Sequence, residues 1–154
     1  MRFIVERDAL ADGVMWVSRS LSARPIMPVL LGVLIKADNA QVSGVTVKGA
    51  NGEGIFILAQ LGQNFHSVKI DNVSAINNRN GIYLIADTAA QVDNFIVTNS
   101  LASNNSSIGV NLLLNNGAKV TYSYIGNMIA NTNGSSGISI QGLNKNGSWN
   151  IFVD

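Results

Sequence analysis

The side chains best suited to catalysis in residues 41–154 are five widely spaced carboxylates: Glu53, Asp71, Asp87, Asp93 and Asp154. Hydrolysis of a glycosidic bond needs two carboxylates at a fixed separation, one to donate a proton and one to attack or to activate water. These carboxylates occupy different positions of the repeat described below, so no such pair is assembled. Asp87 is the best single candidate, and we prefer to interpret it as a solvated corner residue. We predict no catalytic residue.

The other chemistry-bearing residues indicate no metal or cofactor site. His66 is the single histidine, has no equivalent elsewhere in the repeat, and is expected at the surface. The chain has no cysteine, which excludes disulfides, thiolate nucleophiles and the common structural zinc sites. A formal net charge of +1, with 12% charged residues, gives no general electrostatic basis for binding nucleic acid or an anionic membrane. We expect no metal and no cofactor.

The carboxylates are positioned by an internal repeat of 27–28 residues. The motif GIFI begins at Gly54, GIYL at Gly81, GVNL at Gly109 and GISI at Gly137, in steps of 27, 28 and 28 residues. Each period holds short runs that alternate apolar and polar residues between Asn, Gly and Ser corners, and no run of helical spacing intervenes. Residues 41–154 are therefore predicted to form a mainly β fold, a right-handed parallel β-helix of about four coils.

Alternation along the GIFI-type strands separates an inward column from an outward one. The predicted inward residues are Ile55, Ile82, Val110 and Ile138, followed by Ile57, Leu84, Leu112 and Ile140. The predicted outward residues are Phe56, Tyr83, Asn111 and Ser139, followed by Leu58, Ile85, Leu113 and Gln141. This outward face is unusually apolar, so we expect the N-terminal helix, a second subunit or a sugar ring to cover it. Phe56, Tyr83 and Asn111 are the predicted contacts with carbohydrate or a partner.

A second series of residues repeats in phase with the first and places asparagines at Asn72, Asn99 and Asn127. Asparagine tolerates the left-handed backbone conformation of tight corners, and its amide can bond to the same residue one coil away. We predict a structural role for this asparagine column.

The Asn-rich coils, each with a GI-type strand, resemble the right-handed parallel β-helix proteins of the pectate-lyase-like superfamily over residues 41–154. The resemblance implies the fold. It also implies polysaccharide substrates, clustered carboxylates, often calcium, and an arginine or lysine base, and the residues above do not assemble such a site. A polysaccharide lyase or hydrolase fragment without its active site is therefore one hypothesis. The final segment, 150–154, looks like the start of a fifth coil, so we expect a truncated or rearranged chain.

Residues 1–40 have a different composition. They hold nine of the nineteen charged residues and both prolines, whereas nineteen of the twenty asparagines come later. Residues 1–6 alternate as a short strand does, and 8–21 carry apolar residues at helical spacing. Pro25 and Pro28 end the helix, and the apolar run 29–36 predicts a second strand. This strand–helix–strand segment is expected to cap the open end of the β-helix.

The sequence of residues 1–38 carries a second resemblance, through the VERD start, the LADGVMWVSRSL helix, the ARPIMPVL loop and the LLGVLIKA strand. Together these resemble the N-terminus of a bacterial DNA polymerase III β sliding clamp, in particular the actinobacterial type. By position, the resemblance implies that Arg24 contacts DNA. The likeness stops at Val42, where the family continues differently. A clamp subunit needs three similar domains, so this chain is not expected to encircle DNA.

These patterns leave three hypotheses for function. The leading one is a non-enzymatic β-helix module, structural or interacting, that faces carbohydrate or a second copy. The second is a truncated or fused clamp fragment, for which we expect weak DNA binding at most, because the arginines of residues 1–40 are balanced by nearby acids. The third is the polysaccharide lyase or hydrolase fragment described above.

The start of the chain bears on where the protein is found. Glu6 and Asp8 interrupt the apolar core of a secretory signal, so a cytoplasmic location is expected, although β-helix relatives are often secreted. The longest apolar run, 25–35, is well below the roughly 20 residues of a membrane-spanning helix, so no membrane partner is expected.

Overall fold

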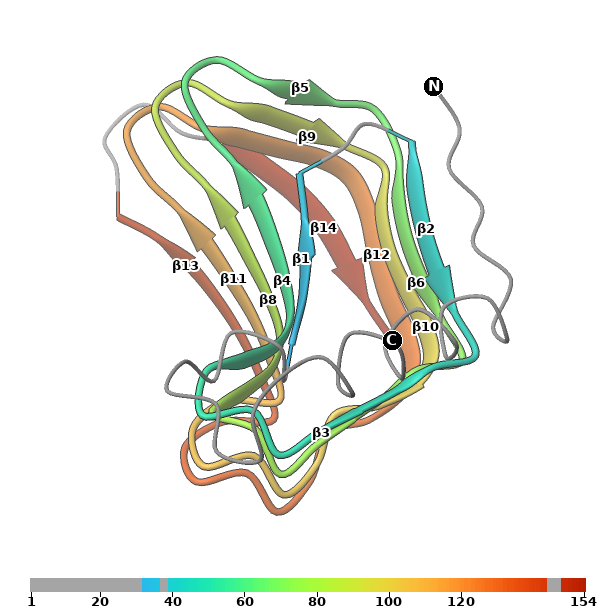
Figure 1. The fold of residues 1–154 in the computed structure, drawn as a ribbon. Coiled ribbons are helices and arrows are strands. Elements are labelled where there is room, and N and C mark those ends of the chain that lie inside the picture. The colour runs from blue at the N-terminus through green and yellow to red at the C-terminus, as the bar shows by residue number, and fades with distance from the viewer. Residues whose placement is uncertain (1–31, 37–38, 144–147) are drawn as a thin grey trace, which may run out of the picture.

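A computed structural model of the chain describes residues 32–36, 39–143 and 148–154, and these residues form a parallel β-solenoid of about four turns (Figure 1). The described residues are strands, turns and bends, with no helix. The fold class predicted from the repeat is confirmed. The expected strand at 1–6, the capping helix at 8–21 and Arg24 lie outside the described residues. The described part of the chain contains no helix with the length and hydropathy that crossing a membrane requires.

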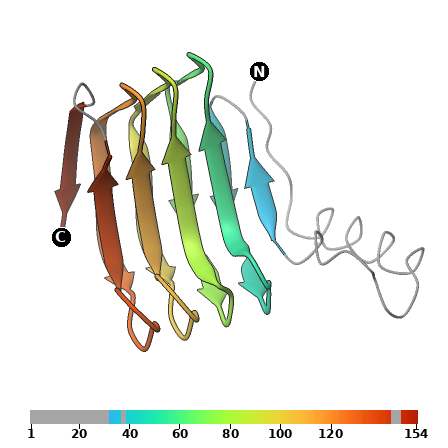
Figure 2. The same cartoon turned by 90° about the vertical axis from the view of Figure 1, so that its left-hand side faces the viewer.

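One sheet has five strands in the order β1 (Val33–Ile35), β4 (Glu53–Ala59), β8 (Asn80–Ala86), β11 (Val110–Leu114) and β13 (Ile138–Gly142). All neighbours are parallel, and from β4 onward each strand is one repeat away from the next. Ile55 pairs with Ile82, Ile82 with Val110, and Val110 with Ile138. The predicted period is therefore the register of the sheet. Figure 2 shows these strands side by side, from β1 in blue to β13 in red.

The second sheet has nine strands and follows the order β2 (Ala40–Ser43), β6 (Val68–Asp71), β10 (Phe95–Leu101), β12 (Lys119–Ile129), β9 (Gln91–Asp93) and β5 (Asn64–Phe65). Three strands lie off this path: β14 (Ser148–Val153) pairs with β12, β7 (Ser74–Ile76) with β10, and β3 (Thr46–Lys48) with β7. The view along the solenoid shows the two sheets enclosing a common interior (Figure 1).

The interior is a continuous stack of aliphatic side chains from both sheets. On the five-stranded sheet, the predicted inward residues of β4, β8 and β11 are fully buried: Ile55, Ile57, Ile82, Leu84, Val110 and Leu112. The facing sheet contributes Val68, Ile70, Phe95, Val97, Val120 and Ile125. Each buried side chain of this size contributes about 1.5–3 kcal/mol to stability. The stack therefore holds the coils together, and the predicted inward column is correct for these three strands.

The glycine that begins each GIFI-type motif is required by the close approach of successive coils. A Cβ on Gly81 would lie 2.6 Å from the carbonyl oxygen of Gly109, and one on Gly54 would lie 2.7 Å from that of Gly81. Real Cβ atoms essentially never approach an oxygen so closely. The absence of a Cβ at these glycines therefore permits the close approach of successive coils where β4 and β8 begin.

Asparagines supply most of the left-handed corners. Among the described residues, eight of the thirteen non-glycine positions with positive φ are asparagines, including Asn72, Asn99 and Asn127 at φ between 50° and 53°. Asn127 also donates a hydrogen bond from Nδ2 to the Oδ1 of Asn99, one coil away. Short amide side chains tolerate this backbone conformation better than other non-glycine residues do.

A separate stack of asparagines joins successive coils: Asn78 and Asn105, which are buried, and Asn133, which is half-buried. The Oδ1 of Asn105 accepts from the backbone N–H of Asn78 at 3.0 Å, and the Oδ1 of Asn133 accepts from that of Asn105 at 3.0 Å. Their Nδ2 groups donate to the carbonyls of Val47, Ala75 and Ala102. The stack thus satisfies backbone groups that a corner would otherwise leave buried and unpaired.

Candidate functional site

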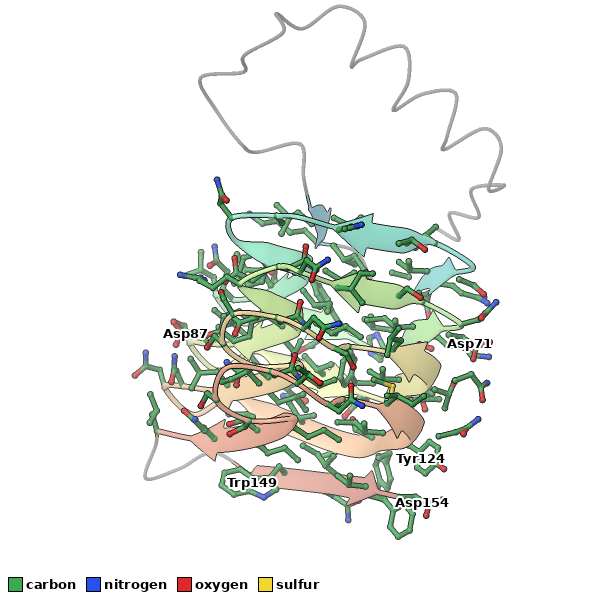
Figure 3. The ribbon with its side chains drawn as sticks, turned by 90° about the horizontal axis from the view of Figure 1, so that it is seen from below. Asp71, Asp87, Tyr124, Trp149 and Asp154 are labelled. Carbon is green, nitrogen blue, oxygen red and sulfur yellow. The ribbon has the colours of Figure 1, made fainter. Side chains whose placement is uncertain are left out.

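The carboxylates of the repeat lie apart and tie neighbouring coils together. Asp71 and Asp87 lie on opposite sides of the solenoid (Figure 3). The Oδ1 of Asp71 accepts from Thr98 Oγ1 and from Asn99 Nδ2, both at 2.8 Å. The Oδ1 of Asp87 accepts from Asn116 Nδ2 at 2.7 Å. Each of these bonds crosses about one repeat, so the carboxylates have an evident structural use.

The protonation of Asp71 also fits a structural use. Hydrogen bonds from Asn99 and Thr98 hold the pKa of its carboxyl below the ordinary value of 3.8, and the Lys69 ammonium at 3.8 Å adds to this effect. A general acid at neutral pH needs the opposite shift, because it must keep its proton. Asp71 therefore remains an ionised hydrogen-bond acceptor.

The metal-binding residue types do not gather in the structure. Among the described residues, no group of three or more histidine, cysteine, aspartate or glutamate side chains is placed to hold a metal ion. His66 is exposed, as the sequence predicts.

The outer face of β4, β8 and β11 carries the cluster that we call the aromatic patch, defined as Phe56, Tyr83 and Asn111 with Leu58, Ile85 and Leu113. The first three are neighbours in the strand register, and so are the last three. The rings of Phe56 and Tyr83 lie 5.6 Å apart between centroids, at 37° to each other. Both are half-buried, so part of each ring faces outward as the alternation predicts.

Asn111 departs from the expectation of an exposed outward residue. Its exposed fraction is only 8%, and its Oδ1 has no hydrogen-bond partner within the described part of the chain. Its neighbours in the register are Tyr83 on one side and Ser139 on the other. A buried polar atom without a partner costs about 1–3 kcal/mol. Strand alternation alone could not reveal this burial, because it depends on how the neighbouring side chains pack.

Charged residues border one end of the aromatic patch, where β4 and β8 begin. Arg79 forms an ion pair and hydrogen bond with Glu53 Oε1, which also accepts from Asn80 Nδ2 at 3.3 Å. Burial raises the pKa of the Tyr83 phenol, and the negative charge of Glu53 raises it further. Tyr83 therefore keeps its proton and can donate a hydrogen bond over the whole physiological pH range.

Sequence reasoning missed a shallow polar groove of about 350 Å³ at the successive corners that precede β4, β8 and β11. It is lined by Gly49, Ala50, Asn51, Asn77, Asn78, Arg79, Asn104 and Ser106. The Asn77–Asn78 and Asn104–Asn105 pairs, one repeat apart, were the available signal. The amide of Asn78 is already used within the asparagine stack, so the groove presents mainly corner residues.

The beginning of the chain is similar to a replication protein family. Residues 1–64 match the family model of the DNA polymerase III beta subunit, N-terminal domain. A beta sliding clamp of Streptomyces coelicolor is 56% identical over 43 residues, which are 28% of this chain and 11% of that protein. The beta sliding clamp of Micrococcus luteus is 58% identical over 43 residues, which are 28% of this chain and 14% of that protein. The beta sliding clamp homolog GriR of Streptomyces muensis is 53% identical over 38 residues, which are 25% of this chain and 10% of GriR.

The chain therefore spans about a tenth of the length of the curated relatives that it matches. The clamp resemblance predicted for residues 1–38 is confirmed, but the expectation that it stops at Val42 is wrong, because the family model extends to residue 64. No solved structure matches the chain.

The matched residues 1–64 reach well into the solenoid. They include β1, whose Val33 and Ile35 pair with Ile55 and Ile57 of β4. The strand predicted at 29–36 is thus present as β1 in the described residues, and it is the first strand of the five-stranded sheet. Arg24, the residue that the clamp resemblance assigns to DNA contact, lies outside the described residues.

Proposed function

We propose that the solenoid is a non-enzymatic binding module and that the aromatic patch is its contact surface for a polysaccharide. A sugar ring would stack on Phe56 and Tyr83, and its hydroxyl groups would pair with the Asn111 amide and the Tyr83 phenol. The apolar faces of pyranose rings suit aromatic side chains, and the polar rim at Glu53 and Arg79 suits ring hydroxyls.

One observation carries this proposal: Asn111 is buried on the outer face with an unpaired Oδ1. For folding alone, an aliphatic residue would serve better there, because the middle of a strand favours β-branched side chains and the unpaired amide is destabilising. Local choices that oppose the stability of a fold are expected at functional or strained sites, and a ligand would use such a residue. Asn111 lies beside Tyr83, so the same ligand would use both side chains.

The Asn111→Val variant separates binding from folding. We expect its free energy of unfolding to be unchanged or raised by up to about 1 kcal/mol, measured by urea denaturation. We also expect it to lose binding to an oligogalacturonate or xylo-oligosaccharide that the unaltered protein binds in isothermal titration calorimetry.

Tyr83→Ala should weaken the same binding by at least about tenfold, or ~1.4 kcal/mol. Tyr124→Ala is the matched control, since it removes an aromatic ring from the other sheet and should leave the affinity unchanged. If both Asn111→Val and Tyr83→Ala keep full affinity, the aromatic patch is not the binding surface. If the unaltered protein binds neither the oligogalacturonate nor the xylo-oligosaccharide, the proposal that the ligand is a polysaccharide is refuted.

A second candidate function is that of a DNA polymerase III β clamp fragment, and the matches to beta sliding clamps favour it. Here Arg24 would contact the DNA backbone. We expect weak, salt-sensitive binding at most, because Arg2, Arg7, Arg19 and Arg24 are balanced by Glu6, Asp8, Asp12 and Asp38. Submicromolar affinity for duplex DNA at physiological salt in fluorescence anisotropy, lost in Arg24→Ala, would favour the clamp function over the binding module.

A further inference from the structure

The polar groove at the corners that precede β4, β8 and β11 runs from coil to coil. Its lining includes the same corner position on successive coils, Gly49, Asn77 and Asn104, in steps of 28 and 27 residues. These corners stack on one another at one edge of the solenoid, at the lower left of Figure 1. Neighbouring coils lie about 4.8 Å apart, so the groove presents its polar groups at a regular spacing.

Two groove residues on neighbouring coils, Asn77 and Asn104, present free amide groups. Both are exposed, and neither side chain forms a hydrogen bond with another described residue. Both have a φ of 56°, and the equivalent positions hold Gly49 at 77° and Thr132 at 53°. The left-handed corner therefore does not require an amide at this position. Each of the two amides can donate hydrogen bonds to a ligand and accept them from it.

The ion pair of Arg79 and Glu53 joins the groove to the aromatic patch. Arg79 lines the groove, and Glu53 is the first residue of β4, on which Phe56 follows. Tyr83 comes four residues after Arg79, which is roughly 13 Å along an extended strand. The two charges of the pair offset each other. An uncharged chain that crosses from the patch to the groove therefore covers no lone charge, whose loss of water would be costly.

The lining of the groove suits the hydroxyl groups of sugars. Its volume of about 350 Å³ lies at the lower end of the range for ligand pockets, enough for a short stretch of a sugar chain. Besides the free amides, the lining offers the exposed hydroxyl of Ser106 and the guanidinium of Arg79. None of the described lining residues is aromatic, so the groove would bind a sugar through hydrogen bonds, whereas ring stacking stays confined to Phe56 and Tyr83.

We propose that the groove is a second subsite for the polysaccharide of the aromatic patch, and that one chain runs along the strand direction from the patch, over the Arg79 ion pair, to Asn77 and Asn104. The inference rests on the proposed function and adds a direction and two contact residues to it. A ligand long enough to reach both subsites binds more tightly than a disaccharide, because the second contact is made without a second loss of translational freedom.

The dependence of affinity on chain length tests the proposal. Isothermal titration calorimetry with xylobiose and xylohexaose, and with digalacturonate and hexagalacturonate, compares a ligand confined to the patch with one that also reaches the groove. In the class that binds, we expect the affinity for the hexasaccharide to exceed that for the disaccharide by at least about tenfold. Equal affinities for the two lengths would overturn the second subsite.

The Asn77→Gly/Asn104→Gly variant removes both amides and keeps the left-handed corners, because glycine adopts positive φ readily. Its affinity for the hexasaccharide should fall to that for the disaccharide. Its affinity for the disaccharide should equal that of the unaltered protein, which also shows that the variant folds. Asn72→Gly is the matched control, since Asn72 is an exposed corner asparagine at φ 53° on the other sheet, and it should change neither affinity.

The outcomes separate this inference from the proposed function. Full affinity of the double glycine variant for the hexasaccharide would overturn the groove subsite, and the aromatic patch would still stand if Tyr83→Ala weakened binding. An equal loss in Asn72→Gly would also overturn the groove subsite, because the effect would not be specific to it. If the unaltered protein bound none of the four oligosaccharides, both the groove subsite and the proposed function would be overturned.

Discussion

Inner and outer side chains alternate along the same strands β4, β8 and β11, yet the two columns differ in burial and in residue type. The inner column is uniformly aliphatic and fully buried. The outer column mixes half-buried aromatic and aliphatic side chains with the buried Asn111, whose Oδ1 is unpaired. Stacking of coils constrains the inner column alone, because every inner side chain must fit above and below its equivalents. The outer column is free to carry function.

The largest expected effect on stability comes from comparing an inner and an outer residue that are adjacent in β8, Leu84 and Tyr83. Leu84→Ala should lower the free energy of unfolding by about 2–5 kcal/mol, because it removes burial and leaves a cavity between Ile57 and Leu112. Tyr83→Ala should cost about 1 kcal/mol or less, since the ring is only half-buried against Phe56. Urea denaturation of both variants measures the difference. Equal losses would mean that the outer column is as constrained as the inner one.

A smaller effect is expected from the interior asparagine stack. Asn105→Ala should lower the free energy of unfolding by about 1–3 kcal/mol, because it leaves the buried N–H of Asn78 and the carbonyl of Ala75 unpaired. Asn64→Ala, an exposed strand residue, is the control and should change stability by about 0.5 kcal/mol or less. A neutral Asn105→Ala variant would show that water replaces the amide and that the stack does not hold the coils.

The smallest effect concerns pH. The pKa of Asp71 is lowered in the folded protein, so its ionised form stabilises the fold above its ordinary pKa of 3.8. That contribution is lost as pH falls from about 4 toward the folded-state pKa. The unaltered protein should therefore lose a few degrees more in Tm between about pH 5 and pH 3 than Asp71→Asn does. The difference is small because Asp71 is only half-buried, so water screens its interactions. Identical pH profiles would mean that the bonds from Thr98 and Asn99 do not favour the charged carboxylate.

Much of the fold was predictable because the repeat reports the register directly. The GI-type motifs predicted the pairing of Ile55, Ile82, Val110 and Ile138, and the alternation predicted that Leu84 is buried beside an outward Tyr83. The glycine of each motif has a matching physical cause in the close contact between coils.

Other features depend on contacts that a linear pattern does not encode. Asparagines occur at nearly every corner, so composition could not distinguish the buried Asn78 and Asn105 of the asparagine stack from exposed corner residues such as Asn72 and Asn99. The burial of Asn111 follows from its neighbours on adjacent coils. That burial carries the proposed function, so the repeat predicts the scaffold better than it predicts the surfaces.

One measurement tests the stacked register most directly. Ile96 and Tyr124 are outward neighbours on β10 and β12, paired one repeat apart. Because adjacent strands lie about 4.8 Å apart, cysteines at both positions should form an intramolecular disulfide on mild oxidation. Mass spectrometry of the Ile96→Cys/Tyr124→Cys variant should therefore find nearly complete cross-linking. The Ile96→Cys/Ile125→Cys variant should stay reduced, because Ile125 points into the interior. Cross-linking of the second pair but not of the first would contradict the register, and with it the separation of inner and outer columns.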